Sequence, residues 1–196
     1  MTLKTKMLAI FVVAPLALVG SMTLANANEF EGQLRNYSQD VKAWLSDPVV
    51  IDAVKAQNAE NANLTQQDID NLDKQWRAET AATDKPLIDK VLARPLSNFL
   101  REKADAAQGL ITEIFVMDNK GLNVGQSDVT SDYWQGDEAK WQKTFLVGPG
   151  AIHMSDVELD ESTQTYQSQL SLPVVDSDGK TVIGAVTVGV NVELLE

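Results

Sequence analysis

The sequence predicts an α+β domain: a long N-terminal helix and smaller helices packed on a five-stranded antiparallel sheet. Between residues 30 and 108, apolar side chains recur every three or four positions, which is the spacing of amphipathic helices. From residue 109 onward, apolar runs are separated by glycine-bearing turns, which is typical of strands joined as hairpins. Helices followed by strands, rather than alternating with them, favour an antiparallel sheet.

The start of the chain has the pattern of a secretory signal. Two lysines precede the apolar run Met7–Val19, and Ala25-Asn26-Ala27 supplies the small residues that signal peptidase reads. We expect residues 1–27 to be a signal peptide and residues 28–196 to be one domain in the periplasm. The alternative is an uncleaved membrane anchor, because residues 7–24 approach the length that spans a bilayer.

Composition excludes several classes of function. The formal net charge is −12, so the chain repels nucleic acid, and we expect no nucleic-acid partner. There is no cysteine, which excludes disulfides and thiolate metal sites. The acidic pairs lack the spacing of a calcium loop. We therefore expect neither a metal nor a cofactor.

The helical part is expected over residues 30–108. The face of the first helix is made of Phe30, Leu34, Tyr37, Val41, Trp44 and Leu45. A second helix should begin at Pro48 with Asp47 as N-cap, and a third after Thr65, with Asp68 as a variant of the capping box. The last should run from about Pro86 to Ala107 and kink or break at Arg94-Pro95, because proline disrupts helical hydrogen bonding.

The sheet part is expected over residues 109–193. Its predicted strands are Ile111–Met117, Leu122–Gln126, Ala151–Leu159, Thr165–Val175 and Thr181–Val192. Residues 118–121 and 176–180 should form hairpin turns, because each contains aspartate and glycine. Residues 131–144 should form a loop and a short helix.

These segments resemble the single Cache domain, an extracytoplasmic sensor module with a PAS-like sheet that is also called a PDC sensor. The sharpest parts are FVMDNKGLNVGQS, TSDYWQGDEAKW and LPVVDSDGKTVIGAVTVGVNVE, in that order. The resemblance implies binding of a small carboxylate or amino acid. Family members usually lie between two membrane spans in histidine kinases or chemoreceptors. This sequence ends after its last strand, so we expect it to act through a membrane-bound kinase or chemoreceptor partner.

The loop after the second strand carries the main candidates for a ligand pocket. Tyr133 and Trp134 combine a flat apolar face with one hydrogen-bonding group, and Asp132 offers a carboxylate for an ammonium or hydroxyl group. Gln126 would add a neutral donor and acceptor from the strand, and Trp141 would add a second indole. The alternative is that the aromatic side chains belong to a core under a short helix.

Two further candidates lie outside that loop. Arg94 precedes a proline within a helical segment, where an irregular backbone could direct it inward to hold an anion; otherwise it pairs with a carboxylate on the helix surface. His153 is the only histidine and would touch the pocket edge from the third strand, or else be an ordinary strand residue.

No serine lies in a nucleophile turn and no nucleophile has an evident base, so an enzyme is not expected. The sequence thus predicts a periplasmic small-molecule sensor domain. The alternative is a structural or adaptor protein of the envelope that retains the sensor fold without a ligand.

Overall fold

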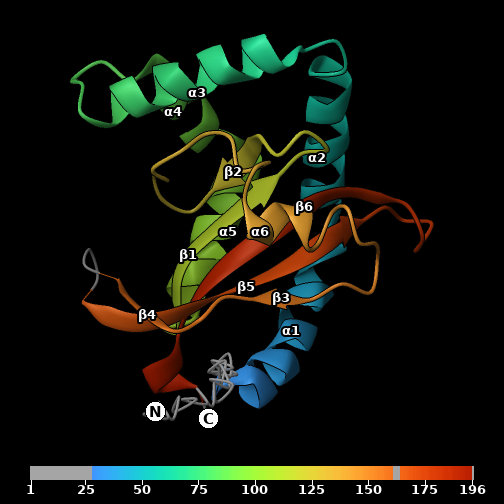
Figure 1. Ribbon diagram of the computed structural model, residues 1–196, viewed down its shortest axis with the longest axis vertical. Helices are drawn as coiled ribbons and strands as arrows, with labels where there is room; N and C mark the ends of the chain where they lie inside the picture. Colours follow the sequence, from blue (N-terminus) through green and yellow to red (C-terminus); the bar gives the residue numbers. More distant parts are fainter. Residues whose placement is uncertain (1–27, 161–163, 196) are drawn as a thin grey trace, which may run out of the picture.

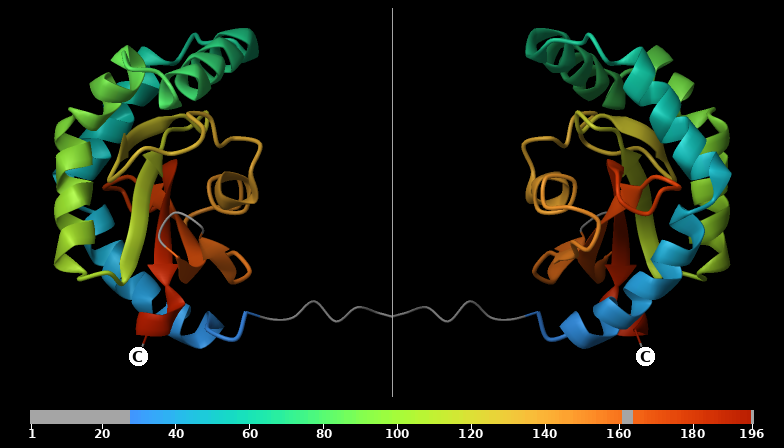
Figure 2. Two further views of the ribbon diagram at one scale, coloured as in Figure 1. Left: turned by 90° about the vertical axis from the view of Figure 1, so that its left-hand side faces the viewer. Right: turned by 90° about the vertical axis from the view of Figure 1, so that its right-hand side faces the viewer.

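Helices cover one face of an antiparallel sheet, and the loop after the second strand covers part of the other face (Figures 1 and 2). This computed structural model describes residues 28–160 and 164–195. The predicted signal peptide lies outside these residues. The α+β class predicted from the sequence is confirmed.

In the part of the chain that the structure describes, five helices precede the sheet, and their ends follow the sequence signals. They are α1 (Glu31–Leu45), α2 (Pro48–Glu60), α3 (Gln66–Thr80), α4 (Pro86–Leu92) and α5 (Pro95–Ala106). The Asp47 carboxylate accepts a hydrogen bond from the N–H of Val49, and the predicted capping box at the start of α3 is present. The break at Arg94 is also confirmed, since Arg94 has extended backbone between α4 and α5.

Within residues 28–160 and 164–195 the sheet has six strands, one more than the five predicted. They are β1 (Ile111–Met117), β2 (Asn123–Gln126), β3 (His153–Met154), β4 (Glu158–Asp160), β5 (Thr165–Val175) and β6 (Val182–Asn191). A short helix, α6 (Ala139–Gln142), lies between β2 and β3, and a single 3-10 turn, Val192–Leu194, follows β6. The order is β2-β1-β6-β5-β3, with β4 also pairing with β5.

The extra strand arises because the predicted strand Ala151–Leu159 is divided. Both of its parts pair with β5, but the ladder is interrupted after Met154. There the hydroxyl of Ser155 accepts the N–H of Gln169 at 2.9 Å, in place of a strand carbonyl. A side-chain acceptor of this kind competes with regular strand pairing, as serine does in turns.

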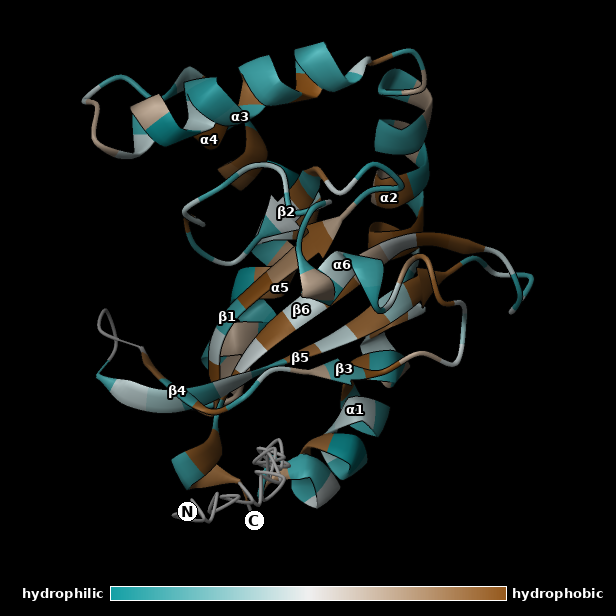
Figure 3. Ribbon diagram, viewed as in Figure 1, coloured by the Kyte–Doolittle hydropathy of each residue, from teal (hydrophilic) through white to brown (hydrophobic). Residues whose placement is uncertain are grey.

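The main core lies between the helices and the sheet, where the hydrophobic effect favours burial of the apolar strand residues. Its members include Leu34, Val41, Val54, Leu100, Ile114, Val116, Leu172, Val186 and Val188. Figure 3 shows apolar residues along the strands and α2, whereas α3 is largely hydrophilic. A smaller cluster on the opposite face contains Phe115, Met117 and Ala185 under Trp141 and Phe145.

Strand β2 has an irregular register against β1, which decides where its side chains point. Gln126 pairs with Phe115 and Asn123 pairs with Met117, so these polar residues share the face of the smaller cluster. Val124 belongs to the core on the helix side. One four-residue strand therefore presents amides to one face of the sheet and an apolar side chain to the other.

Candidate functional site

A hollow of about 340 Å³ lies between the face of the sheet that lacks long helices and the loop after β2. Its lining comes from β1 (Glu113 and Phe115), the loop (Val129, Thr130, Ser131 and Gln135), α6 (Lys140), β4 (Glu158 and Leu159) and β5 (Gln167 and Gln169). The volume falls in the range of small-molecule pockets. The hollow therefore lies in the region in which the sequence predicted a ligand pocket.

Polar groups of both charge signs surround this hollow. The ammonium group of Lys140 lies 2.8 Å from the Glu138 carboxylate and 3.2 Å from Oε1 of Gln135. It also lies 5.4 Å from the centre of the Phe115 ring, within the range of a cation–π contact. On the sheet side, Nε2 of Gln169 donates to the Glu113 carboxylate at 2.8 Å. A small molecule here would meet a cation, carboxylates, amides and one aromatic ring.

Helix α3 holds the covering loop in place through one carboxylate. Oδ1 of Asp73 accepts the backbone N–H groups of Tyr133 and Trp134, at 2.9 and 3.0 Å. Arg77 bridges Asp73 and Asp132, with nitrogen–oxygen distances of 2.7 Å to both. The loop is thus fixed by side-chain acceptors as well as by apolar packing.

The aromatic residues of the loop pack against neighbouring elements. The Tyr133 ring stacks on Trp76 of α3, with centroids 5.2 Å apart and planes 15° apart. Tyr133 is only 4% exposed, and burial raises the pKa of its phenol to about 12, against the opposing effect of the nearby Arg94 guanidinium. The indole of Trp134 donates to the carbonyl of Lys120 at 2.8 Å.

Close backbone contact joins the same loop to the β1–β2 turn. Gly121 has a φ of +85°, and a Cβ there would lie 2.5 Å from the backbone of Gly136. The N–H of Gln135 donates to the Gly121 carbonyl at 2.8 Å. Glycine is needed at position 121 because both the positive φ and the contact disfavour a side chain.

The structure brings together only part of the predicted residue set. The loop above the hollow contains Tyr133, Trp134 and Asp132, but their side chains contact α3 and the β1–β2 turn. The neighbouring residues Ser131 and Gln135 line the hollow instead. The prediction that the three bind ligand stays a prediction.

Gln126 lies one layer behind the hollow. Its Oε1 is 3.4 Å from the hydroxyl of Thr130, which lines the hollow, and accepts from Nδ2 of Asn123 at 3.1 Å. Both amides are fully buried, yet Oδ1 of Asn123 and Nε2 of Gln126 have no hydrogen-bond partner. Buried polar groups are seldom left unpaired, so this pair could accommodate an additional donor and acceptor.

Trp141 and His153 lie further along the same face. The Trp141 ring stacks on Phe145 at 4.8 Å, its indole donates to the Asp118 carbonyl, and it covers Met117 and Ala185. His153 pairs with Ser171 across β3 and β5. Burial, with the charges of Lys143 and Lys140, lowers the pKa of His153. Neither residue lines the hollow.

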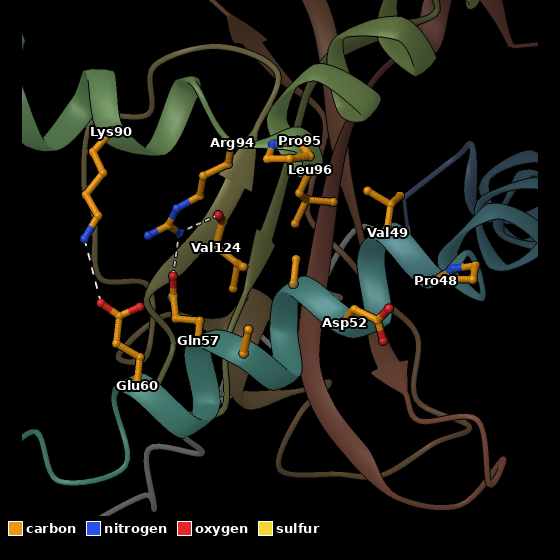
Figure 4. Close-up of a pocket in the computed structure, with 12 residues that line it drawn as sticks. Pro48, Val49, Asp52, Gln57, Glu60, Lys90, Arg94, Pro95, Leu96 and Val124 are labelled. Carbon is orange, nitrogen blue, oxygen red and sulfur yellow. Dashed lines mark hydrogen bonds and ion pairs between the residues drawn. The ribbon is translucent and has the colours of Figure 1, made fainter.

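Arg94 lies at the α4–α5 junction beside the buried Tyr133 phenol and does not line the first hollow. One terminal nitrogen, Nη1, donates to Oε1 of Gln57 and to the carbonyl of Val124, both at 2.6 Å. Of the two alternatives for Arg94, the inward orientation is the one found, and no ion pair joins it to a carboxylate among the described residues. The prediction that Arg94 binds ligand stays a prediction. Arg94 lines a second hollow of about 460 Å³ between α2 and the α4–α5 segment (Figure 4).

Sequence reasoning missed the polar residues that the strands contribute to the first hollow. Glu113, Gln167 and Gln169 lie on β1 and β5, in strands that otherwise supply the core. The signal was the alternation of polar and apolar residues in TYQSQLSL, where every second side chain faces away from the helices.

Among the described residues, no group of three or more histidine, aspartate or glutamate side chains could hold a metal ion. No helix in residues 28–160 or 164–195 is long and apolar enough to cross a membrane.

Comparison with known proteins finds similar folds among sensory domains. No family model matches the chain. No curated protein matches it either. The sensory domain of the Campylobacter jejuni chemoreceptor Tlp3 aligns with 85% of this chain and 63% of its own, at 16% identity and a TM-score of 0.41. The sensor domain of the V. cholerae histidine kinase DctB aligns with 83% of this chain and 55% of its own, at 14% identity and a TM-score of 0.43.

A third similar structure is the ligand-binding domain of the Pseudomonas aeruginosa amino-acid chemoreceptor PctC in complex with GABA, at 12% identity and a TM-score of 0.36. This chain spans less than two thirds of the length of each of the three. Because these TM-scores and identities are low, the similarity does not indicate what this chain binds. The proteins found are sensory domains, which is the kind of module that the sequence resembles.

Proposed function

We propose that this chain is a periplasmic sensor domain of the Cache type that binds a small carboxylate or amino acid in the hollow between the sheet and the loop after β2. The observation that supports this most is the lining of that hollow, which combines Lys140, the carboxylates of Glu113 and Glu158, and the Phe115 ring. A zwitterion needs a cation for its carboxylate and an anion for its ammonium group. The bound state would be read by a membrane-bound sensor kinase or chemoreceptor.

The experiment is a thermal-shift screen of amino acids, organic acids and amines against residues 28–196, followed by calorimetry on any compound that binds. A ligand at a hundred times its dissociation constant adds about 2.7 kcal/mol to the free energy of unfolding, which is a shift of several degrees. A flat result over the whole panel would contradict the proposal.

Two lysine variants locate the site. Lys140→Gln removes the cation that faces the hollow, whereas Lys143→Gln removes an exposed lysine three residues away. We expect the first to weaken a carboxylate-bearing ligand by about tenfold or more, since a hydrogen bond to a charged group contributes about 1.5–3 kcal/mol. The second should leave the affinity unchanged. Equal affinities in the two variants would remove Lys140 from the site.

A structural or adaptor protein is the second candidate, and one observation favours it. Trp141 and Phe145 pack over Met117 and Ala185, so side chains of the chain itself cover this part of the sheet face. This candidate would be supported if no compound in the thermal-shift screen bound and an envelope protein bound to this face of the sheet.

A further inference from the structure

We propose that the groove between α2 and the α4–α5 segment is a second small-molecule site, which takes a monocarboxylate with an aliphatic tail and holds its carboxylate on Arg94. This site goes beyond the proposed sensor function, because it lies on the opposite face of the sheet. The groove has a volume of about 460 Å³, which suits a small molecule better than a helix or a protein partner.

The walls of the groove are mostly apolar. They are formed by Val49, Ala53 and Ala56 of α2, facing Pro95, Leu96 and Val124 (Figure 4). Val124 and Leu96 are almost fully buried and form the floor. Burial of the aliphatic part of a ligand is favourable there, because each buried CH₂ group contributes about 0.8 kcal/mol. Burial of a polar group is unfavourable, because the group would lose its hydrogen bonds to water.

Arg94 supplies a cation at one end of these walls. Its Nη1 is committed to Gln57 and Val124, and Figure 4 shows the other terminal nitrogen directed toward the open space between Lys90 and Glu60. Arginine has five N–H donors, so a planar acceptor can still be bound by the nitrogens that Gln57 and Val124 do not use.

The guanidinium has no carboxylate in direct contact among the ion pairs of the described residues. Instead, Gln57 stands between it and the buried carboxylate of Asp118: Oε1 of Gln57 accepts from Arg94, and Nε2 donates to Asp118 at 3.0 Å. The other neighbours of the guanidinium, the Val124 carbonyl and the Tyr133 phenol, are neutral, so its positive charge remains available to an incoming anion.

The rim selects for a single negative charge. Glu60 lies near the Arg94 end, where Lys90 partly compensates it at 3.7 Å, and Asp52 lines the groove further along α2. A second carboxylate on the ligand would extend along the apolar walls toward Asp52 and be repelled. An aliphatic monocarboxylate is therefore a better fit than a dicarboxylate.

The test uses 4-methylpentanoate as the probe and 4-methylpentanamide, which has the same shape without the charge, as its matched compound. Calorimetry on residues 28–196 should show binding of the acid, and the amide should bind about tenfold or more weakly. Equal binding of the two compounds, or no binding of the acid at its highest soluble concentration, would overturn the proposal.

Substitution of two alanines of α2 tests the location of the site while Arg94 is left unchanged. Both are exposed, but Ala56 lines the groove and Ala59 does not. Ala56→Leu should fill the groove and weaken 4-methylpentanoate at least tenfold, whereas Ala59→Leu should bind it like the wild type. Unchanged affinity in Ala56→Leu would overturn the proposal.

Two more variants test the role of the Arg94 guanidinium and whether this site is separate from the first hollow. Arg94→Lys keeps the charge but loses the planar fork, so we expect a several-fold weaker interaction in a protein with the wild-type circular dichroism spectrum. Lys140→Gln should leave the affinity for 4-methylpentanoate unchanged. A loss in Lys140→Gln with none in Ala56→Leu would place the compound in the other hollow and overturn this assignment while leaving the proposed sensor function standing.

Discussion

The carboxylate of Asp73 on α3 accepts the backbone N–H of Tyr133, 60 residues further along the chain, at 2.9 Å. The same oxygen accepts the N–H of Trp134, so two backbone donors of the loop over the sheet depend on one side chain. A backbone N–H that is buried without an acceptor is costly. The position of this loop, and with it the roof of the first hollow, is therefore determined largely by α3.

Asp73→Ala should lower the free energy of unfolding by about 1–3 kcal/mol, because it leaves the N–H groups of Tyr133 and Trp134 without their acceptor. Chemical denaturation measures this value. Asp70→Ala on the same helix is the control, since Asp70 accepts only from the exposed side chain of Gln66, and its effect should stay within about 0.5 kcal/mol. Similar losses in both variants would contradict the assigned role.

Gly121→Ala should be strongly destabilising. An L-residue at a φ of +85° costs about 1–2 kcal/mol, and displacement of the Gly136 backbone adds about 1–3 kcal/mol. Thermal unfolding of the variant should show a clear drop in Tm. Gly150→Ala provides the comparison, because a Cβ there meets nothing within 4 Å. A Gly121→Ala protein with wild-type Tm would show that the two glycines do not approach each other.

His153 should make the protein less stable as the pH falls below the ordinary histidine value. Burial and the charges of Lys143 and Lys140 lower its pKa in the folded protein, so the unfolded chain binds the proton more readily. This stability is complete above about pH 6.5, the unfolded pKa, and is lost as the pH falls toward the lowered pKa of the folded state. His153→Gln should flatten the pH dependence in this range, measured by urea denaturation. An unchanged slope would contradict the prediction.

Tyr133 should contribute to unfolding at high pH. Its folded pKa is about 12, above the value of about 10 for an exposed phenol, so the unfolded chain loses this proton first as the pH rises through that interval. Ultraviolet titration should show a tyrosine that ionises near pH 12, and Tyr133→Phe should abolish that phase. The stability of Tyr133→Phe relative to the wild type should also be more favourable at pH 11 than at pH 8. If the late phase persisted, another tyrosine would be its source.

The helical half could be predicted closely because its signals are local. Asp47 with Pro48, Thr65 with Asp68, and Arg94 with Pro95 each act within a few residues, and each lies at the helix boundary or break that it predicted. The division of the third predicted strand could not be foreseen, since it depends on a hydroxyl of Ser155 reaching a strand partner far away in the sequence.

The first hollow lies beside the loop that the order of strand, turn and loop singled out, but the residues that line it were mostly not predicted. Tyr133 and Trp134 have the composition expected of either a ligand pocket or a packed interface. Tyr133 stacks on Trp76 and its backbone N–H donates to Asp73, and local spacing cannot relate these two residues of α3 to the loop. The polar residues of β1 and β5 were visible only as an alternation within otherwise apolar strands.

The short β2 strand forms part of the surroundings of both hollows, with Gln126 behind one and Val124 in the floor of the other. Strand side chains alternate, so a slip of a single residue would exchange these faces, placing an amide among the apolar walls and a valine beneath the loop. The hydroxyl of Ser97 accepts the N–H of Gln126 at 3.0 Å, and that of Ser127 accepts the N–H of Ile114 at 2.8 Å. Two serine hydroxyls thus help fix the alignment on which both cavities depend.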